Sequence, residues 1–513
     1  MKLEFIKKNK VLQIVLCLLL SLSIALFSTY LMIDSIKIPY IIATFILSFA
    51  IVFYTLYAKR KELLEKVFSD RIALVIGTIL GVILFYEYKL HAVSQIKIIN
   101  AKFSLISHLH FLIVPGLLLI SVVVTLLIKN WLIDFYNRMD KYDKKLYIIF
   151  SILSFVIIFY LYNKTDMFYT QYDKIYSMDS GYIFNKILLN SHYYDIRHPL
   201  LGIITFPVFS TISFIFNSSL QPIILQFINV QLLLLIALEL RQLTNKRIVF
   251  FLYMFSFSSI LFIMFLEKFI LCVFFIVTYL YNHIIKNKSD ARIFALALGT
   301  MPTSGYIGLV EFFSKNKIKE KIMNIVKLGI TTISVFIVSG RIHVFRYGLE
   351  EMITKRNDFA SKVFSVGEKL TAEFSMIKHC FIAMPSKVIN QKFMWSNVTG
   401  KVSLVAILVF IVLLIGIKSL RRYNKSLCNS FVTALIFSFV LFIGLNWSVH
   451  ESPLFSFYFS WAIIPLFVFG FEQLLEWAHI KEKYYKYIYV LMIMFMIYKD
   501  IPVIIKLLNY VNI

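Results

Sequence analysis

The chain has 513 residues, of which 59% are hydrophobic and 16% are charged, and its formal net charge is +25. Apolar runs long enough to cross the roughly 30 Å of a bilayer recur from end to end, so the sequence predicts an all-α, polytopic integral membrane protein. Continuous runs such as residues 402–417 do not alternate in polarity, which excludes a transmembrane β-barrel, and the Lys and Arg residues lie mostly in short connections, so no nucleic-acid partner is expected.

Composition also bounds the cell type and compartment. The four cysteines (Cys17, Cys272, Cys380 and Cys428) are scattered and indicate neither a disulfide framework nor a metal site. The opening residues 1–10 are basic and precede a long apolar run without a small-residue cleavage site, so we interpret this run as a retained first span. Abundant Lys, Ile, Asn, Phe and Tyr suggest an AT-rich, bacterial genome. The predicted location is therefore a bacterial plasma membrane, crossed many times.

About 12–13 transmembrane helices are expected, together with re-entrant or juxtamembrane helices. The predicted spans cover residues 11–32, 40–58, 72–90, 109–128, 146–162, 223–240, 248–265, 268–284, 328–340, 402–418, 429–445, 458–473 and 487–505. The connections 59–71 and 129–145 are basic, which places them and the N-terminus in the cytoplasm by the positive-inside rule. Five crossings then put residues 163–198 outside.

Two segments are predicted not to cross the membrane fully. The connections 241–247, 286–292 and 418–425 are basic and should be cytoplasmic. That parity holds only if residues 199–217 form a short helix or hairpin that dips into the membrane and residues 291–313 form a re-entrant hairpin. The turn at 266–268, the segment 341–401 and the turn 446–457 then lie outside.

This topology predicts four parts. Residues 1–145 form an N-terminal four-helix membrane extension, and 146–340 form a membrane core that contains the outer loop 163–198. Residues 341–401 form a second outer segment, and 402–513 form the C-terminal transmembrane helices.

Asp179 is the first candidate for chemistry. It lies just outside a span on a segment rich in Tyr and Phe, where partial desolvation would raise its pKa and make it a proton acceptor for an alcohol. The alternative is a solvated loop aspartate or a helix N-cap, because Asp179, Ser180 and Gly181 precede a helical pattern.

Arg197, His198 and Pro199 form the second constellation, at the end of the same loop. A guanidinium at headgroup level can make bidentate hydrogen bonds to a phosphate, and proline suits the first turn of the helix that follows. The alternative is an interfacial arginine that reaches ordinary lipid phosphates.

Further charged groups are predicted on the outer side. Glu267 and Lys268 occupy a tight turn between two apolar helices, where they are either a structural ion pair or a second carboxylate beside Asp179 with a cation next to it. Arg341, His343 and Arg346 begin the long outer segment and could hold an anionic leaving group or simply contact lipid headgroups. The turn residues His450 and Glu451 lack the second histidine of a zinc-protease motif.

With these residues in view, the chain resembles the GT-C glycosyltransferases, in particular the relatives of protein mannosyltransferases and aminoarabinose transferases. The resemblance lies in an acid in the first large outer loop (Asp179), a following Arg-His-Pro-Leu at the start of an apolar helix, and a second acid on a later outer turn (Glu267). It covers mainly residues 146–284. Serine at position 180, where many relatives have glutamate, and the single proline after His198 depart from the family pattern.

The resemblance implies an inverting transfer of a sugar from a polyprenyl-phosphate donor to an acceptor on the outer face, such as an envelope glycan, a lipid or a protein. It implies Asp179 as base, Glu267 as auxiliary acid and His198 as part of the loop motif. From their charge and position in the chain, the residues expected to bind the donor phosphate are Arg197, His198, Lys268, Arg341, His343 and Arg346. No cofactor is required, and whether a divalent cation takes part is left open. A lipid-linked polysaccharide polymerase or ligase and a transporter or flippase are the alternatives.

Overall fold

The computed structural model describes residues 10–30, 38–96, 110–164, 174–176, 178, 198–314, 317–342, 364–396 and 398–511. Within these residues, ten helices are long and apolar enough to cross a membrane, and an eleventh is counted if a bent helix pair forms one span. The prediction of an all-α polytopic membrane protein is therefore confirmed, with fewer long helices than the 12–13 expected. The difference arises partly because two predicted spans, 72–90 and 268–284, are shorter apolar helices in the described part.

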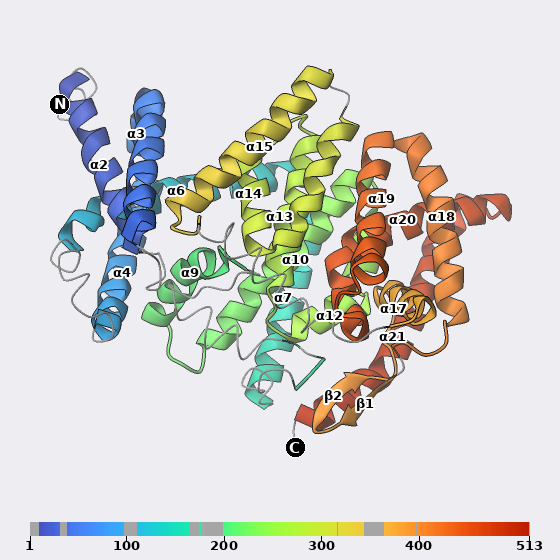
Figure 1. The fold of residues 1–513 in the computed structure, drawn as a ribbon. Coiled ribbons are helices and arrows are strands. Elements are labelled where there is room, and N and C mark those ends of the chain that lie inside the picture. Colours follow the sequence, from blue (N-terminus) through green and yellow to red (C-terminus); the bar gives the residue numbers. More distant parts are fainter. Residues whose placement is uncertain are drawn as a thin grey trace. The chain divides into compact units, whose positions relative to one another are not determined.

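The chain divides into two compact units. Unit 1 comprises Met1–Leu146, Lys186–Gln221 and Ile330–Leu349, and unit 2 comprises Tyr147–Asn185, Pro222–Gly329 and Glu350–Ile513. Figure 1 shows the helices of both, coloured along the sequence. The four parts expected from the sequence follow the order of spans along the chain, whereas these units group residues that are close in space. The four-part division therefore stays a prediction.

Unit 1 is a helical bundle. Its helices are α2 (Lys10–Tyr30), α3 (Ile38–Ser69), α4 (Arg71–Ile96), α6 (His110–Arg138) and α9 (Leu201–Ile215). The backbone of Gly77 on α4 lies against α6, because a Cβ atom at this position would be 2.4 Å from the Cα atom of Val122. Gly116 on α6 donates its N–H to the hydroxyl of Ser23 on α2 at 2.8 Å. Small residues thus let these helices approach closely, as in other membrane helix pairs.

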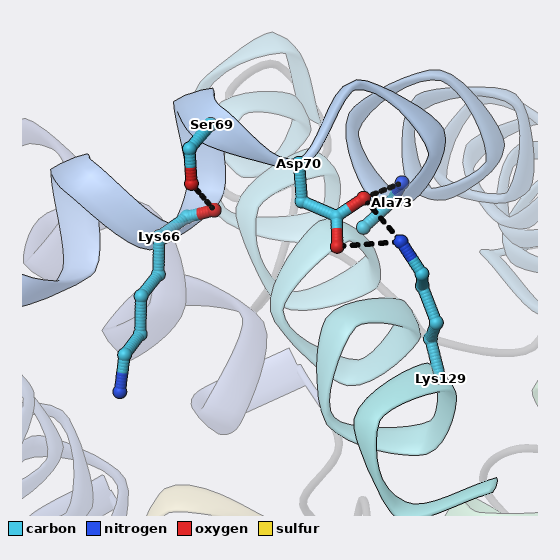
Figure 2. Close-up of polar contacts among 5 residues, drawn as sticks. All are labelled: Lys66, Ser69, Asp70, Ala73 and Lys129. Carbon is cyan, nitrogen blue, oxygen red and sulfur yellow. Dashed lines mark hydrogen bonds and ion pairs between the residues drawn. The ribbon is translucent and has the colours of Figure 1, made fainter. Parts of the chain in front are cut away.

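A polar junction joins α4 to α6 where α4 begins. Asp70 caps α4 by accepting the Ala73 N–H at 3.0 Å, and both of its carboxylate oxygens lie 2.7 Å from the Lys129 ammonium. Figure 2 shows this arrangement and the bond from the Ser69 hydroxyl to the Lys66 carbonyl. The Asp70 carboxylate thus caps the first turn of α4 and pairs with the positive charge of Lys129.

Unit 2 is built around a central helix, α20 (Ser456–Trp477), whose apolar window is 89% buried. Helix α20 packs against α11 (Arg247–Met254), α12 (Phe257–Met264), α13 (Phe269–Ile284), α17 (Val366–His379), α18 (Leu404–Tyr423) and α19 (Lys425–Phe439). The other helices are α7 (Lys141–Lys164), α10 (Gln221–Thr244), α14 (Ala291–Thr300), α15 (Ile318–Val338) and α21 (Tyr485–Val511). Shorter elements are the 3₁₀ helices at Pro302–Phe313, Val449–Phe455 and Glu482–Tyr484, the π-helical turn Val440–Gly444, and the strands β1 (Ser386–Ile389) and β2 (Lys392–Trp395). Both α7 and α15 extend across the boundary between the units.

The predicted span 248–265 is wrong as a single helix. Helices α11 and α12 meet at a bend of 56°. Ser256 stands at the break and its side chain accepts the N–H of Ser259, while Phe257 donates its N–H to the Phe381 carbonyl at 3.1 Å. These partners satisfy the backbone groups that the break frees, which is the condition for an irregular segment at membrane depth.

The two segments predicted not to cross have the short elements that were expected. Residues 199–217 contain only the 15-residue helix α9, which is about 22 Å long and shorter than a span. In the other segment, α14 ends at Thr300, Met301 is extended, and Pro302–Phe313 returns as a 3₁₀ helix. Because Glu311 lies 3.3 Å from His283, near the end of α13 from which the chain leads into α14, this segment is a hairpin.

Candidate functional site

The predicted site residues fall into three groups. Asp179, Arg197, His343 and Arg346 lie outside the described residues. His198 and Arg341 belong to unit 1, and Glu267 and Lys268 belong to unit 2. The assignment of all eight to one site therefore stays a prediction, and the local structure of each described residue is given below.

In unit 1, both basic residues are buried. His198 is 4% exposed and its carbonyl accepts the N–H of Leu201 at 3.1 Å, immediately before α9. Arg341 is fully buried and follows Gly340, whose φ of 68° ends α15. The Arg341 N–H bonds to the Phe336 carbonyl and the Gly340 N–H to that of Ile337, which is a Schellman motif. The glycine therefore fixes where the Arg341 side chain leaves the helix.

In unit 2, Glu267 occupies the turn between α12 and α13. It is 3% exposed, and its Oε2 atom accepts the N–H of Lys268 at 3.2 Å, directly before α13 begins. The helices on both sides pack against the start of α20: the rings of Phe262 and Phe457 stack at 4.4 Å, and Phe269 meets Phe455 edge-on at 5.7 Å. The prediction of a carboxylate in a tight apolar turn is confirmed.

The start of the loop 163–198 lies beside this turn. Tyr162, at the end of α7, directs its hydroxyl to the carbonyl of Met264, the last residue of α12, at 3.5 Å. Tyr162 also packs against a buried cluster of Ile158, Ile223 and Val230. Tyr162, two residues before α7 ends, thus contacts the end of α12 three residues before Glu267.

Residues just before Asp179 are held by the β1–β2 hairpin. Tyr176 donates its N–H to the Phe393 carbonyl at 2.8 Å, and Phe393 donates its N–H to the Lys174 carbonyl at 2.7 Å, so this stretch lies against β2 as a short additional strand. Met178 then donates its N–H to the Ile175 carbonyl, which closes a turn directly before Asp179. The sequence had not predicted these strands inside the long segment 341–401.

A row of rings leads from this stretch to the broken span. Tyr176 stacks on Trp395 at 4.5 Å, Trp395 meets His379 edge-on at 5.8 Å, and His379 meets Phe257 at 4.9 Å. The residue after His379 also reaches the start of α20, because the Cys380 thiol lies 3.3 Å from the Ser456 carbonyl. The turn of Glu267 and the helix that supports the loop therefore both contact the first turns of α20.

Glu373 on α17 is a buried acid that sequence reasoning missed. Its Oε1 atom lies 2.6 Å from the Ser438 hydroxyl, which also lies 2.8 Å from the Leu435 carbonyl. A hydroxyl has one hydrogen, so both contacts are hydrogen bonds only if Glu373 is protonated and donates to Ser438. Burial raises the pKa of Glu373 to about 8, which agrees with a neutral carboxyl at pH 7.

His379 is a second buried group on α17 that was not predicted. It is fully buried between aromatic rings, and within the described residues neither ring nitrogen has a hydrogen-bond partner. Burial lowers the pKa of His379 to about 3, so the imidazole is neutral. The sequence gives no signal of this burial, because the segment has the pattern of an amphipathic helix with a solvated polar face.

Within the described residues, no group of three His, Cys, Asp or Glu side chains is arranged to hold a metal ion. Because Asp179 is outside these residues, the question of a divalent cation at that position stays open. Comparisons of this chain with protein-family models, with curated proteins and with solved structures gave no match. A functional proposal therefore depends on the residues and their geometry.

Proposed function

We propose that this chain is a membrane glycosyltransferase of GT-C type that moves a sugar from a polyprenyl-phosphate donor to an acceptor at the membrane surface. The observation that supports the proposal is the meeting of two acid-bearing segments in unit 2. The loop of Asp179 starts beside the last turn of α12, and Glu267 follows that turn. A lipid-linked donor can reach such a place without leaving the bilayer.

In this proposal, Asp179 takes the proton of the acceptor hydroxyl as that oxygen attacks the anomeric carbon. The bond from the anomeric carbon to the phosphate oxygen breaks, and the polyprenyl phosphate leaves with the electron pair. Inversion follows from attack on the face opposite the leaving group. General-base catalysis of this kind contributes about 10²- to 10⁴-fold to the rate.

Glu267 suits an auxiliary role. Its side chain is buried and accepts a backbone N–H, so it is held in place and its remaining acceptor capacity can orient a sugar hydroxyl. Lys268, the residue after Glu267, is proposed to contact the donor phosphate, since a cation stabilises the charge that develops on it.

The decisive experiment measures sugar transfer from a labelled polyprenyl-phosphate sugar in membranes that contain the full chain. Asp179→Asn is expected to lower transfer about a hundredfold or more, because it removes the base. Glu267→Gln is expected to lower transfer less. Glu62→Gln is the matched control, since Glu62 is an exposed partner of Lys66 on α3. Equal transfer by wild type and Asp179→Asn would contradict the proposal.

A transporter or flippase is the second candidate, and one observation favours it. Two helices that qualify as spans carry buried carboxylates: Glu239 on α10 is fully buried and Asp500 on α21 is 1% exposed. Intramembrane acids often line ion or proton pathways. Glu239 accepts a hydrogen bond from Thr278 at 2.8 Å, and Asp500 accepts the Ala383 N–H at 2.7 Å, so each also has a structural role. The test measures transport of an envelope precursor into vesicles that contain the chain. Transport that is abolished by Glu239→Gln but unaffected by Asp179→Asn would favour the transporter.

A further inference from the structure

The tip of the β1–β2 hairpin exposes apolar side chains. Its strands pair Val388 with Phe393 and Ile389 with Lys392. They are joined by Asn390 and Gln391, both with positive φ, as in a tight two-residue hairpin turn. Val388 is 55% exposed and Ile389 is 39% exposed. Because consecutive residues of a strand point to opposite faces, Val388 and Ile389 expose apolar surface on both faces of the tip.

The hairpin is held at the end of α21. The Tyr510 hydroxyl donates to the Gln391 carbonyl at 2.6 Å, and the rings of Tyr510 and Phe393 are 5.6 Å apart. Figure 1 shows the two strands beside the C-terminal turns of this helix. The position of the tip along the membrane normal is therefore set by α21.

Helix α21 presents an apolar face that is open to lipid. Its apolar window is only 22% buried, and Tyr498, Ile501 and Ile505 on it are 69%, 46% and 51% exposed. Tyr510 lies five residues beyond Ile505, which is about 7.5 Å along the helix at about 1.5 Å per residue. A tyrosine at that distance from the last open isoleucine has the position that is typical of the interfacial aromatic belt of a span. Its hydroxyl bond to Gln391 places the hairpin turn beside this end of α21.

The charges at the tip suit lipid headgroups. Lys387 and Lys392 flank the apolar pair, so their ammonium groups can meet lipid phosphates while Val388 and Ile389 enter the boundary of the acyl chains. We propose that the β1–β2 hairpin docks on the lipid surface of the membrane that the chain spans. Two exposed side chains are far less than the roughly 800 Å² per partner of a stable protein interface, which argues against a second copy as the occupant.

Docking of the hairpin on lipid also affects the stretch that leads into Asp179. This effect does not depend on glycosyl transfer. Strand β2 carries the bonds to Lys174 and Tyr176, the stretch that leads into Asp179. Contact of the tip with lipid therefore adds a second constraint, besides α21, on the height of that stretch above the membrane. If water surrounded the hairpin, only α21 would set the height of that stretch above the membrane.

The test uses the full chain in lipid vesicles with a bimane label on Val388→Cys. All four native cysteines are buried, so an exposed new thiol is labelled selectively. Ile505→Cys on the open face of α21 is the lipid control, and Lys481→Cys in the exposed turn after α20 is the water control. Each label is quenched separately by a lipid with a shallow doxyl group and by iodide present on both aqueous sides of the vesicles, because positions 388 and 481 lie at opposite ends of α21.

We expect the label at position 388 to be quenched several-fold more by the doxyl lipid than the label at 481, and less by iodide. Quenching by iodide equal to that at 481, with none by doxyl lipid, would overturn the proposal because the tip would face water. Protection from both quenchers would also overturn it, since another protein surface would then cover the tip.

A second measurement tests the lysines. Adding anionic phosphatidylglycerol to phosphatidylcholine vesicles is expected to increase doxyl quenching at position 388. The same labelled chain with Lys387→Gln and Lys392→Gln should show no such increase. If the increase persists without the lysines, their contact with lipid phosphates is refuted.

Discussion

Gly416 on α18 and Gly470 on α20 bring the backbones of these two helices into direct contact. A Cβ atom on Gly416 would lie 1.9 Å from the Leu466 carbonyl oxygen, and one on Gly470 would lie 1.9 Å from the Val412 carbonyl oxygen. Neither distance leaves room for a methyl group. Because the atoms in the way are backbone atoms, they can yield only if the helices move apart.

The first prediction concerns this contact. Gly416→Ala and Gly470→Ala are each expected to destabilise the protein by about 1–3 kcal/mol, the usual cost of overpacking. Gly329→Ala on α15 is the control, since nothing lies within 4 Å of its added Cβ atom. Thermal unfolding in detergent measures the effect. A melting temperature unchanged in both variants would contradict the close approach.

The second prediction concerns the pH dependence from Glu373. Its carboxyl binds a proton more tightly in the folded protein, with a pKa of about 8, than at its ordinary value of 4.5. The free energy of unfolding should therefore fall as pH rises from about 4.5 to 8 and level off above that range. Glu373→Gln should remove this slope and be more stable than wild type above pH 8, whereas Glu320→Gln, on the exposed start of α15, should keep it. Melting temperatures across this pH range decide the outcome.

The third prediction tests the bond that fixes the stretch before Asp179. The Tyr176 hydroxyl lies 2.7 Å from that of Ser386 and its ring stacks on Trp395. Tyr176→Phe should lose about 1 kcal/mol, and Tyr176→Ala more, because stacking and apolar burial are lost as well. Hydrogen exchange of residues 386–395 should rise in that order. Tyr54→Phe, at an exposed position on α3, should change nothing. Equal protection in all variants would show that Tyr176 does not hold the hairpin.

The fourth prediction concerns Asp70 and Lys129. The hydrogen bond from Lys129 holds the pKa of the Asp70 carboxyl below its usual value of 3.8. The stabilisation is present above that value and is lost as pH falls through the lower, folded-state pKa. Asp70→Asn and Lys129→Gln should each lower the free energy of unfolding near neutral pH. The double variant should lower it by less than the sum of the two single effects. Additive effects would show that the pair in Figure 2 does not interact.

Long apolar runs predicted most helices well, because burial in lipid needs length and composition but no particular partner. The predicted span 223–240 corresponds to the helix α10 at Gln221–Thr244, and the predicted span 268–284 corresponds to α13 at Phe269–Ile284. The break at Ser256 could not be predicted in this way. The N–H of Phe257 at the break is satisfied by the carbonyl of Phe381, which is remote in the sequence, and the serines at 256, 258 and 259 give no local signal of that contact.

The candidate site was predictable to a similar extent. Glu267 could be found because a carboxylate in a tight apolar turn is unusual in any sequence. Glu373 and His379 could not, since α17 has the polar composition of a solvated helix, and their burial depends on Ser438, Phe257 and Trp395 from other elements. The residue types are ordinary, and only the packing makes them unusual.

The row of rings from Tyr176 to Phe257 gives unit 2 a mechanical property. Each ring touches the next, so a change in tilt of α12 at the 56° bend must push or pull the stretch before Asp179. A movement of α12 would therefore reach the residues before Asp179 through aromatic contacts, without any ligand as messenger.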